Sequence, residues 1–367
     1  MHYGPSSLRL TLAMTTTEKI LAHFAEQSAI CGNFGSPFTG QLMARMHDDI
    51  AQGGPTARLL EDWPTNPRAD ALALRLTGAA HAAALTNRDP QLAKLYPAQN
   101  PDWRMDEIWP LVRALFEREH AWAHAFIQSA PQTNEIRRSI ALLAGFLHFA
   151  QNWRGPIDML EIGASAGLNQ NWDRFAYRPN GWSWGAESPV VVDTDWNGAP
   201  PPIDAPINVR SRAACDLNPL DIADEAQRLQ LKSYVWPDQP DRLARFDGAV
   251  ALALAHNTKV DRADAAVWLK DKLAARASDA ATIVYHSVFL QYPPRETRQA
   301  IADAITAAGA RASAQAPLAW LRLEPEALTD NVPDSLRMVL DLTTWPGAHR
   351  RILAYTDGHV RSVYVAE

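Results

Sequence analysis

The chain has 367 residues, of which 47% are hydrophobic and 8% aromatic, and this is enough apolar material for two hydrophobic cores. Its 35 Lys and Arg stand against 41 Asp and Glu, a net charge of −6, so no general positive field draws it to nucleic acid or to an anionic membrane. No apolar run approaches the roughly 20 residues of a membrane-spanning helix.

The cysteines and the first residues favour a cytoplasmic protein. Cys31 and Cys215 lie far apart without metal-ligand spacing, which is typical of a reducing compartment, and we expect both to be buried by packing. Residues 1–13 contain one Arg and no extended apolar segment, so they make a poor signal peptide. Met14 precedes a helix-start pattern and is a second candidate for the true start, which would leave residues 1–13 loose. We expect neither nucleic acid nor a membrane as partner.

From Glu18 to about Asn152 the apolar residues recur at helical spacing, and no strand pattern is present. Alanine-rich helices are predicted over 68–86, and one long amphipathic helix over 106–129. A further helix begins near Thr133 or Asn134 and leads into the next segment. We interpret Arg137 and Arg138, on its polar side, as solvated surface charges.

A short apolar run over residues 157–162 contains Glu161 and leads into a loop of small residues at 163–167. We interpret this stretch as a strand, a tight turn and the start of a helix. Gly163 and Gly167 can adopt positive φ and let the backbone approach a ligand, while the helix would point unpaired N–H groups at it. The turn is therefore predicted to hold a nucleotide or nucleoside.

Residue spacing separates three chemistries that use such a turn. The dinucleotide pattern G-x-G-x-x-G fails, because Ser165 and Leu168 stand where it needs Gly and a small residue. The nucleophile elbow G-x-S-x-G fits, with Ser165 as nucleophile. The first motif of class I S-adenosylmethionine-dependent methyltransferases, acid-x-Gly-x-Gly-x-Gly, resembles Glu161-x-Gly163-x-Ser165-x-Gly167. Ser165 is its one departure, since Ser tolerates positive φ less well than Gly. A turn without a ligand is the remaining interpretation.

After this loop the pattern alternates between strands and helices, which is typical of a mostly parallel sheet covered on both faces. Residues 177–206, rich in Gly, Pro and Trp, are predicted to form an inserted hairpin or flap. Further strands are predicted within 208–221, 259–264, 282–289 and 318–324, and a closing β meander over 336–344, 351–356 and 360–366.

Ligands of an open parallel sheet lie outside the carboxyl ends of its strands, so the residues there are the candidates for chemistry. We expect Asp216 to bind the ribose hydroxyls and Asp264 the adenine edge, although each acid could instead cap a turn. Asp193 is the alternative ribose ligand if residues 190–192 form the second strand.

His286 and Ser287 end the fourth predicted strand, on the side where methyltransferases present groups to the substrate. Methyl transfer is an in-line displacement, which needs positioning and requires a base only if the acceptor carries a proton. We predict His286 as that catalytic base, the alternative being a hydrogen-bonded core histidine. Tyr285, Tyr292 and His256 are weaker candidates for lining the acceptor pocket.

A serine hydrolase is a further hypothesis. Ser165 as nucleophile, then Asp341, then His349 or His359 would follow a known chain order for a catalytic triad. The context opposes it, because such an elbow follows several strands and the half before Ile157 looks helical. We rank the hydrolase third, behind a methyltransferase and a non-catalytic nucleotide- or S-adenosylmethionine-binding regulatory module.

Five segments together resemble a bacterial family known as domain of unknown function 2332. The resemblance runs from about Thr133 to Glu324 and implies a soluble bacterial protein with a methyltransferase-like domain. It also makes Ser165 the family's usual residue at its position. The segments are QTNE at 132–135, LEIGASAGLN at 160–169, DLNPLD at 216–221, VWPDQ at 235–239, and His286-Ser287.

We therefore predict a helical N-terminal domain at residues 1–152 and a class I methyltransferase-like, Rossmann-like α/β domain at 153–367, with an insertion at 177–206. The expected function is methyl transfer from S-adenosylmethionine to an unknown small molecule, without a metal. The expected cofactor-binding residues are Glu161 at the methionine end, Gly163, Ser165 and Gly167 along the backbone, Asp216 at the ribose and Asp264 at the adenine.

Overall fold

The computed structural model describes residues 15–366, and the chain forms two compact units. The first comprises the described residues up to Pro131 together with Lys232–Pro240, and the second comprises Gln132–Leu231 and the residues from Asp241 onward. The segment expected to be loose, residues 1–13, lies outside the described residues. Each unit is therefore built from two separate stretches of chain.

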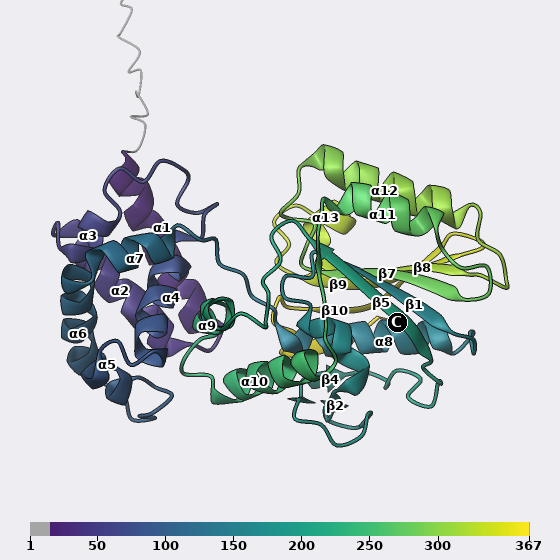
Figure 1. Ribbon diagram of the computed structural model, residues 1–367, viewed down its shortest axis with the longest axis horizontal. Helices are drawn as coiled ribbons and strands as arrows, with labels where there is room; N and C mark the ends of the chain where they lie inside the picture. The colour runs from purple at the N-terminus through teal and green to yellow at the C-terminus, as the bar shows by residue number, and fades with distance from the viewer. Residues whose placement is uncertain (1–14, 367) are drawn as a thin grey trace, which may run out of the picture. The chain divides into compact units, whose positions relative to one another are not determined.

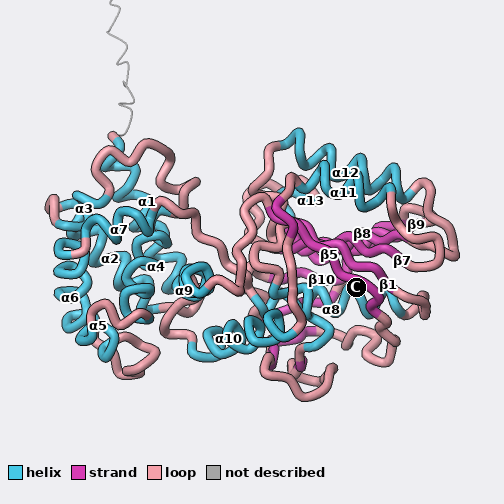
Figure 2. Tube along the Cα trace, viewed as in Figure 1, coloured by secondary structure: helices cyan, strands magenta, loops and turns pink. Residues whose placement is uncertain are grey.

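The first unit is helical in its described part (Figure 2). Thr15 and Glu18 form a reciprocal capping box that starts the first helix. The predicted helix over 106–129 is two helices, because the chain leaves helical geometry at Glu119. The helices are α1 (Thr16–Asn33), α2 (Pro37–Ala51), α3 (Pro55–Leu59), α4 (Leu72–Leu85), α5 (Pro90–Leu95), α6 (Met105–Arg118) and α7 (His120–Ile127).

Residues 232–240 complete this unit by capping one of its helices. The Asp238 carboxylate accepts hydrogen bonds from the Ser36 hydroxyl at 2.6 Å and from the Phe38 amide at 2.9 Å, at the start of α2. A carboxylate is stabilising at the positive end of a helix. One of the family-like segments, 235–239, thus has a structural role here.

The second unit contains the large sheet, whose strand order is β4-β11-β10-β9-β8-β7-β1-β5-β6. Its strands are β1 (Ile157–Ile162), β4 (Asp195–Asn197), β5 (Val209–Asp216), β6 (Asp261–Arg262), β7 (Ala281–Ser287), β8 (Leu318–Pro325), β9 (Met338–Trp345), β10 (His349–Thr356) and β11 (Ser362–Val365). A separate two-stranded sheet pairs β2 (Ala176–Tyr177) with β3 (Val191–Val192).

The strands β6-β5-β1-β7-β8 are parallel neighbours, so in chain order they run 3-2-1-4-5. This is the order of doubly wound nucleotide-binding sheets, in which the switch point lies between the first and fourth of these strands, here β1 and β7. The strands after β8 continue as an antiparallel meander through β9, β10 and β11. The prediction of a mixed α/β fold with a large, mostly parallel sheet is confirmed.

Helices cover both faces of this sheet (Figure 1). On one face α11 and α12 enclose a core that includes Val284 and Trp320. On the other face α8 packs so closely that a Cβ on Gly145 would lie 2.2 Å from the Leu321 side chain. The helices of this part are η1 (Ile136–Arg138), α8 (Ser139–Ala150), η2 (Leu168–Arg174), α9 (Glu225–Ser233), α10 (Pro240–Ala255), α11 (Ala265–Ala274), α12 (Arg295–Gly309) and α13 (Glu326–Thr329).

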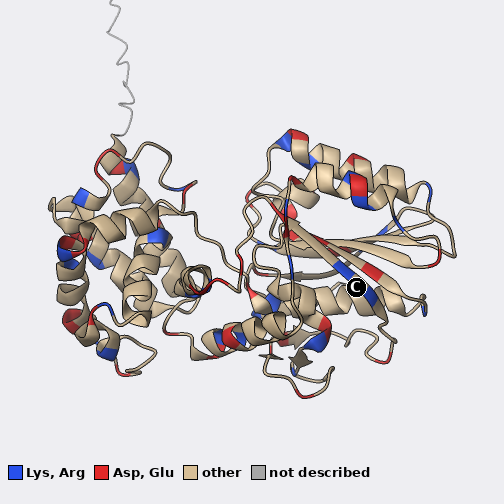
Figure 3. Cartoon of the chain, in the orientation of Figure 1, with Lys and Arg blue, Asp and Glu red and all other residues tan. Residues whose placement is uncertain are grey.

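Several details differ from the sequence expectations. Helix α8, expected in the helical domain, contacts β8 and β9 of the sheet. The helix expected after the small-residue loop is the seven-residue 3-10 helix η2, with non-helical angles at Asn171. Cys31 and Cys215 are buried thiols, as expected. The first half of α10 carries both basic and acidic residues, Arg242 and Arg245 with Asp241 and Asp247 (Figure 3).

Candidate functional site

The loop after β1 has the backbone shape that its small residues predict. Gly163, Ser165 and Gly167 all have positive φ, at 67°, 55° and 73°. This left-handed region is open to Gly and costs other residues energy, so Ser165 is held there by its surroundings. The alternation of left-handed residues folds the chain sharply outside the carboxyl end of β1.

The polar groups of this loop are bound by other segments of the same unit. The Ser165 amide donates to the Asp216 carboxylate at 2.8 Å, and the Ser165 hydroxyl donates to Gln132 Oε1 at 2.9 Å. The Leu168 amide, at the start of η2, donates to Asn134 Oδ1 at 3.1 Å. The expectation that a helix start would offer this amide to a ligand is therefore not met, because Asn134 already accepts from it.

Asp216 links the loop after β1 to the neighbouring strand β5. It ends β5, which pairs with β1 in the large sheet, whereas residues 191–192 pair only with β2. This topology removes Asp193 as the alternative ribose ligand. Asp216 is partly exposed, and its second oxygen accepts from the Asn218 amide at 2.9 Å. Since a carboxylate has about four lone-pair sites, two more hydrogen bonds can be accepted.

Glu161 lies beneath the loop instead of facing outward. Its side chain is buried and accepts a hydrogen bond from the Tyr285 hydroxyl at 3.2 Å. Burial raises the pKa of Glu161 to about 8, and the nearby Asp216 charge adds to the increase while the Tyr285 bond opposes it. At neutral pH Glu161 is mostly a neutral acid that supports the strand end.

The acids predicted at the strand ends do gather in one region. Burial raises the pKa of the Cys215 thiol to about 12, and Asp216, Asp264 and Glu161 add to this increase. Asp264 itself is exposed and caps α11, accepting from the amides of Ala266 and Val267. The turn-capping alternative thus describes the observed contacts of Asp264.

Phe289 covers the glycine face of the loop. A Cβ built on Gly163 would lie 2.2 Å from the Phe289 ring, so the ring occupies the space beside this bare backbone. Phe289 follows Val288, a β-branched residue with a φ of 53°. Its position is set by Glu324, which accepts from the Phe289 amide at 2.8 Å and from the Leu290 amide at 3.0 Å.

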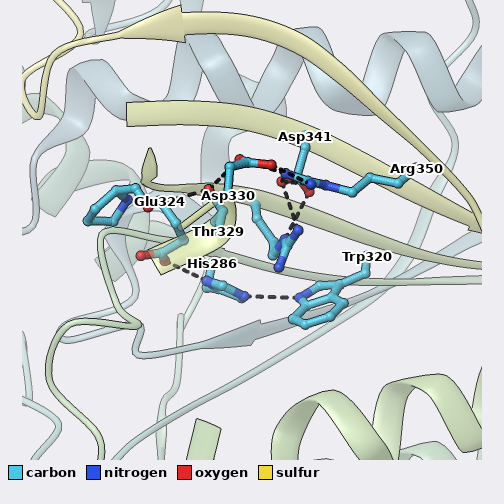
Figure 4. A network of polar contacts seen from close by, with 9 residues as sticks. His286, Trp320, Glu324, Thr329, Asp330, Asp341 and Arg350 are labelled. Carbon is cyan, nitrogen blue, oxygen red and sulfur yellow. Dashed lines mark hydrogen bonds and ion pairs between the residues drawn. The ribbon is translucent and has the colours of Figure 1, made fainter. Parts of the chain in front are cut away.

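His286 is bound on both sides of its ring in the core (Figure 4). The Trp320 indole donates to His286 Nε2 at 3.0 Å, and since an indole N–H can only donate, Nε2 carries no proton. Nδ1 therefore carries it and donates to Glu324 at 2.6 Å. His286 is fully buried, and in this geometry neither nitrogen is open to a substrate.

The hydrolase candidates do not form a triad. Asp341 is buried and accepts from Arg322 and Arg350 (Figure 4). His359 contacts Glu135, at 3.4 Å, and the Ser165 hydroxyl donates to Gln132. Among residues 15–366, no histidine hydrogen-bonds to Ser165.

The weaker pocket candidates also have definite places. Tyr285 is buried against Glu161, whereas Tyr292 is 74% exposed and His256 lies exposed at the end of α10.

Within the described part of the chain, no group of three or more His, Cys, Asp or Glu is placed to hold a metal ion. None of the helices in residues 15–366 has both the length and the apolar content to cross a membrane.

A comparison with protein families matches residues 21–364 to the family described as "Uncharacterized protein conserved in bacteria (DUF2332)". The chain belongs to the DUF2332 family. A search of curated proteins and a search of solved structures each give no match.

Three of the five segments that carry the DUF2332 resemblance meet at the loop. Gln132 binds both Ser165 and, through its amide nitrogen at 2.8 Å, the Asn218 carbonyl. The QTNE, LEIGASAGLN and DLNPLD segments are therefore one hydrogen-bonded unit. Gln132 and Asn134 were not predicted as site residues, although their place in a family-like segment was a usable signal. Glu324 ends a predicted strand and could have been ranked by the same rule as Asp216.

Proposed function

We propose that this protein binds S-adenosylmethionine at the switch point between β1 and β7 and transfers its methyl group to a small molecule. The observation that carries the proposal is the loop with left-handed Gly163, Ser165 and Gly167 at the end of the first strand, tied to Asp216 at the end of the second. An open 3-2-1-4-5 sheet binds ligands outside this edge.

The ribose end of the cofactor fits the residues present. Asp216 has lone pairs left for two ribose hydroxyls. Leu217, the next residue, is 66% exposed and offers an apolar surface to the adenine ring. Arg262 donates to the Leu217 carbonyl and to Asn218, which fixes this surface beside Asp216.

The methionine end requires side chains to move at both glycines, because a Cβ on Gly167 would lie 2.4 Å from Gln170 and 2.7 Å from Val260. Phe289 covers Gly163, so its ring has to turn away before a ligand can reach the backbone there. Glu324 accepts from the two amides that follow Val288 and so sets where Phe289 lies, and His286 Nδ1 donates to the same carboxylate. We assign His286 a positioning role. S-adenosylmethionine supplies an electrophilic methyl group, and the chain's part is to orient the acceptor and exclude water.

Calorimetric titration of S-adenosylmethionine tests the proposal. We expect saturable binding to the full chain and a loss of about tenfold in affinity for Asp216→Asn, which keeps the shape but not the charge. Asp279→Asn is the matched control, because Asp279 is exposed just before the amino end of β7. Absence of binding at millimolar ligand, or equal affinity for both variants, would contradict the proposal.

A non-catalytic S-adenosylmethionine-binding module is the second candidate. It is favoured by the engagement of His286 with Glu324 and Trp320, which leaves His286 no open nitrogen to act as a base. Binding without release of S-adenosylhomocysteine in the presence of fractionated cell extracts would support this alternative. Labelling of Ser165 by a fluorophosphonate probe would instead support the hydrolase.

A further inference from the structure

Four arginines in the second unit surround two carboxylates, and we call this group the arginine cluster. It brings together η1, α10 and the link between β3 and β4. The members are Arg137, Arg138, Arg242, Arg245, Glu135 and Asp193.

In one part of the arginine cluster, the carboxylate of Glu135 is paired with basic side chains. Glu135 is buried and binds Arg242 at 2.6 Å, with His359 at 3.4 Å on the same carboxylate oxygen. Burial alone would raise the pKa of Glu135, but Arg242 and His359 hold it well below its usual range. The Arg138 guanidinium donates to the Gly358 carbonyl at 3.0 Å. The hydrogen bonds of the Glu135 carboxylate to arginine side chains thus go to Arg242, and Glu135 acts on Arg138 and Arg245 only as a nearby charge.

In the other part of the arginine cluster, two arginines share a single carboxylate. Arg137 and Arg245 share one oxygen of Asp193, at 3.4 and 3.2 Å, and the Asp193 side chain is 60% exposed. The Nε atoms of both arginines are buried without a hydrogen-bond partner, and the Arg245 side chain is only 7% exposed. Burial, and next the neighbouring Arg137, lower the pKa of Arg245. These two buried Nε donors lack acceptors that an oxyanion would supply.

We propose that Arg137 and Arg245 bind a phosphate or carboxylate group of a small molecule, and that Asp193 occupies their donors until this oxyanion replaces it. Two guanidinium groups can each donate two parallel bonds to an oxyanion, which the single shared Asp193 oxygen cannot match. The link between β3 and β4 supplies Asp193, so this link moves when the oxyanion enters.

The arginine cluster is built on the segment that also holds the loop after β1. The Glu135 carbonyl accepts from Asn169 in η2 at 3.2 Å, and Asn134 accepts from the Leu168 amide. On the proposed function, this places the oxyanion on the methyl acceptor, so the acceptor class is a phosphorylated or carboxylated small molecule. Only this last step depends on the proposed function.

Binding of inorganic phosphate and of succinate to the full chain tests the oxyanion site without any cofactor. Calorimetric titrations at low chloride should show saturable binding of at least one of the two anions. Asp193→Asn should tighten this binding about tenfold, because the competing carboxylate is gone. Asp195→Asn, a change of the same kind on the exposed strand β4, should leave it unchanged.

The arginine variants identify where the anion binds. In the Asp193→Asn background, Arg137→Gln and Arg245→Gln should each weaken binding about tenfold or more, and Arg137→Lys should fall between because it keeps the charge but loses the planar fork. Arg351→Gln, an exposed arginine on β10, should have no effect. Arg137→Lys covers the case in which Arg245→Gln fails to fold.

The two proposals can fail separately. If anion binding changes with the Arg137 variants but S-adenosylmethionine does not bind, the oxyanion site is supported. Only its assignment to a methyl acceptor is then removed. The oxyanion site is overturned if Asp193→Asn shows no saturable binding of phosphate or succinate. It is also overturned if the affinity in that background does not change with Arg137→Gln and Arg137→Lys.

Discussion

Glu161, under the loop after β1, and Glu135, in the arginine cluster, are buried to a similar degree and yet ionise in opposite ways. Burial raises the pKa of Glu161 to about 8, because its contact is the Tyr285 hydroxyl and the nearest charge is another acid. In Glu135 burial is outweighed by Arg242, which holds the pKa low. The partner, and not burial itself, decides which form is stable.

The two regions also differ in what they leave unsatisfied. The loop amides of Ser165 and Leu168 are bound by side chains of the chain itself. In the arginine cluster, the Nε atoms of Arg137 and Arg245 have no partner. In the first region these amide donors are thus satisfied within the chain, whereas the second has two buried donors without an acceptor.

The largest effect is expected from Glu135→Gln. This change removes the negative charge that the buried Arg242 contacts at 2.6 Å, and we expect the free energy of unfolding at pH 7 to fall by about 3 kcal/mol. Because the folded-state pKa of Glu135 is depressed, its contribution is present above the unfolded value of 4.5 and declines as the pH falls below it. Urea unfolding at pH 7 and pH 3.5 should show a smaller gap from wild type at the lower pH. A constant gap would contradict this account.

Glu161→Gln should change the free energy of unfolding in the opposite direction and stabilise the folded protein. In the unfolded chain Glu161 ionises above 4.5, but in the folded protein it stays protonated until its pKa of about 8, so the wild type loses stability as pH rises between these values. Glutamine does not ionise, so the variant should be more stable than wild type by about 3 kcal/mol at pH 7, with the gain absent below pH 4.5. Urea midpoints across this pH range measure the slope, and the exposed Glu187→Gln is the control. A variant less stable than wild type at pH 7.5 would show that Glu161 is charged.

Two variants of Ser165 measure the strain of its left-handed backbone separately from its side-chain hydrogen bond. Ser165→Ala removes the bond to Gln132 and keeps a side chain at a φ of 55°, so it should cost about 1 kcal/mol. Ser165→Gly also loses the bond but relieves the left-handed conformation, which is worth about 1 kcal/mol, and should be close to wild type. Denaturant unfolding of both variants tests the difference. Equal losses would mean that the strain is not borne by Ser165.

The smallest effect is expected from Asp193→Asn. Its carboxylate is 60% exposed and contacts both arginines at more than 3 Å, so the free energy of unfolding should change by less than about 1 kcal/mol. Added salt should shrink the change further because exposed charges are screened. A loss as large as that of Glu135→Gln would show that Asp193 is a fixed structural partner.

The sequence predicts the strands well but the contacts poorly. β-branched and apolar runs locate β1, β7 and β8, and the strand-end rule finds Asp216. Whether a side chain at a strand end faces outward depends on packing, which is why Asp264 as a cap and His286 between Glu324 and Trp320 could not be read from spacing. The same reason applies to Phe289, which covers Gly163.

The arginine cluster shows a second limit of prediction from the sequence. Arg137 and Arg138 have the spacing of a solvated helix face, but the chain forms the 3-10 helix η1 there, and both side chains are partly buried. Their partners come from residues more than 50 positions away along the chain. No local pattern contains that information.

Hydrogen exchange with and without S-adenosylmethionine tests the central claim most directly. We expect saturating cofactor to slow amide exchange in the peptides that cover residues 161–175, 214–220 and 286–294 and to leave 338–356 unchanged. In Asp216→Asn the same slowing should need about tenfold more cofactor. No slowing in the first three peptides at millimolar cofactor, or slowing only in other parts of the chain, would contradict a cofactor site at the end of β1.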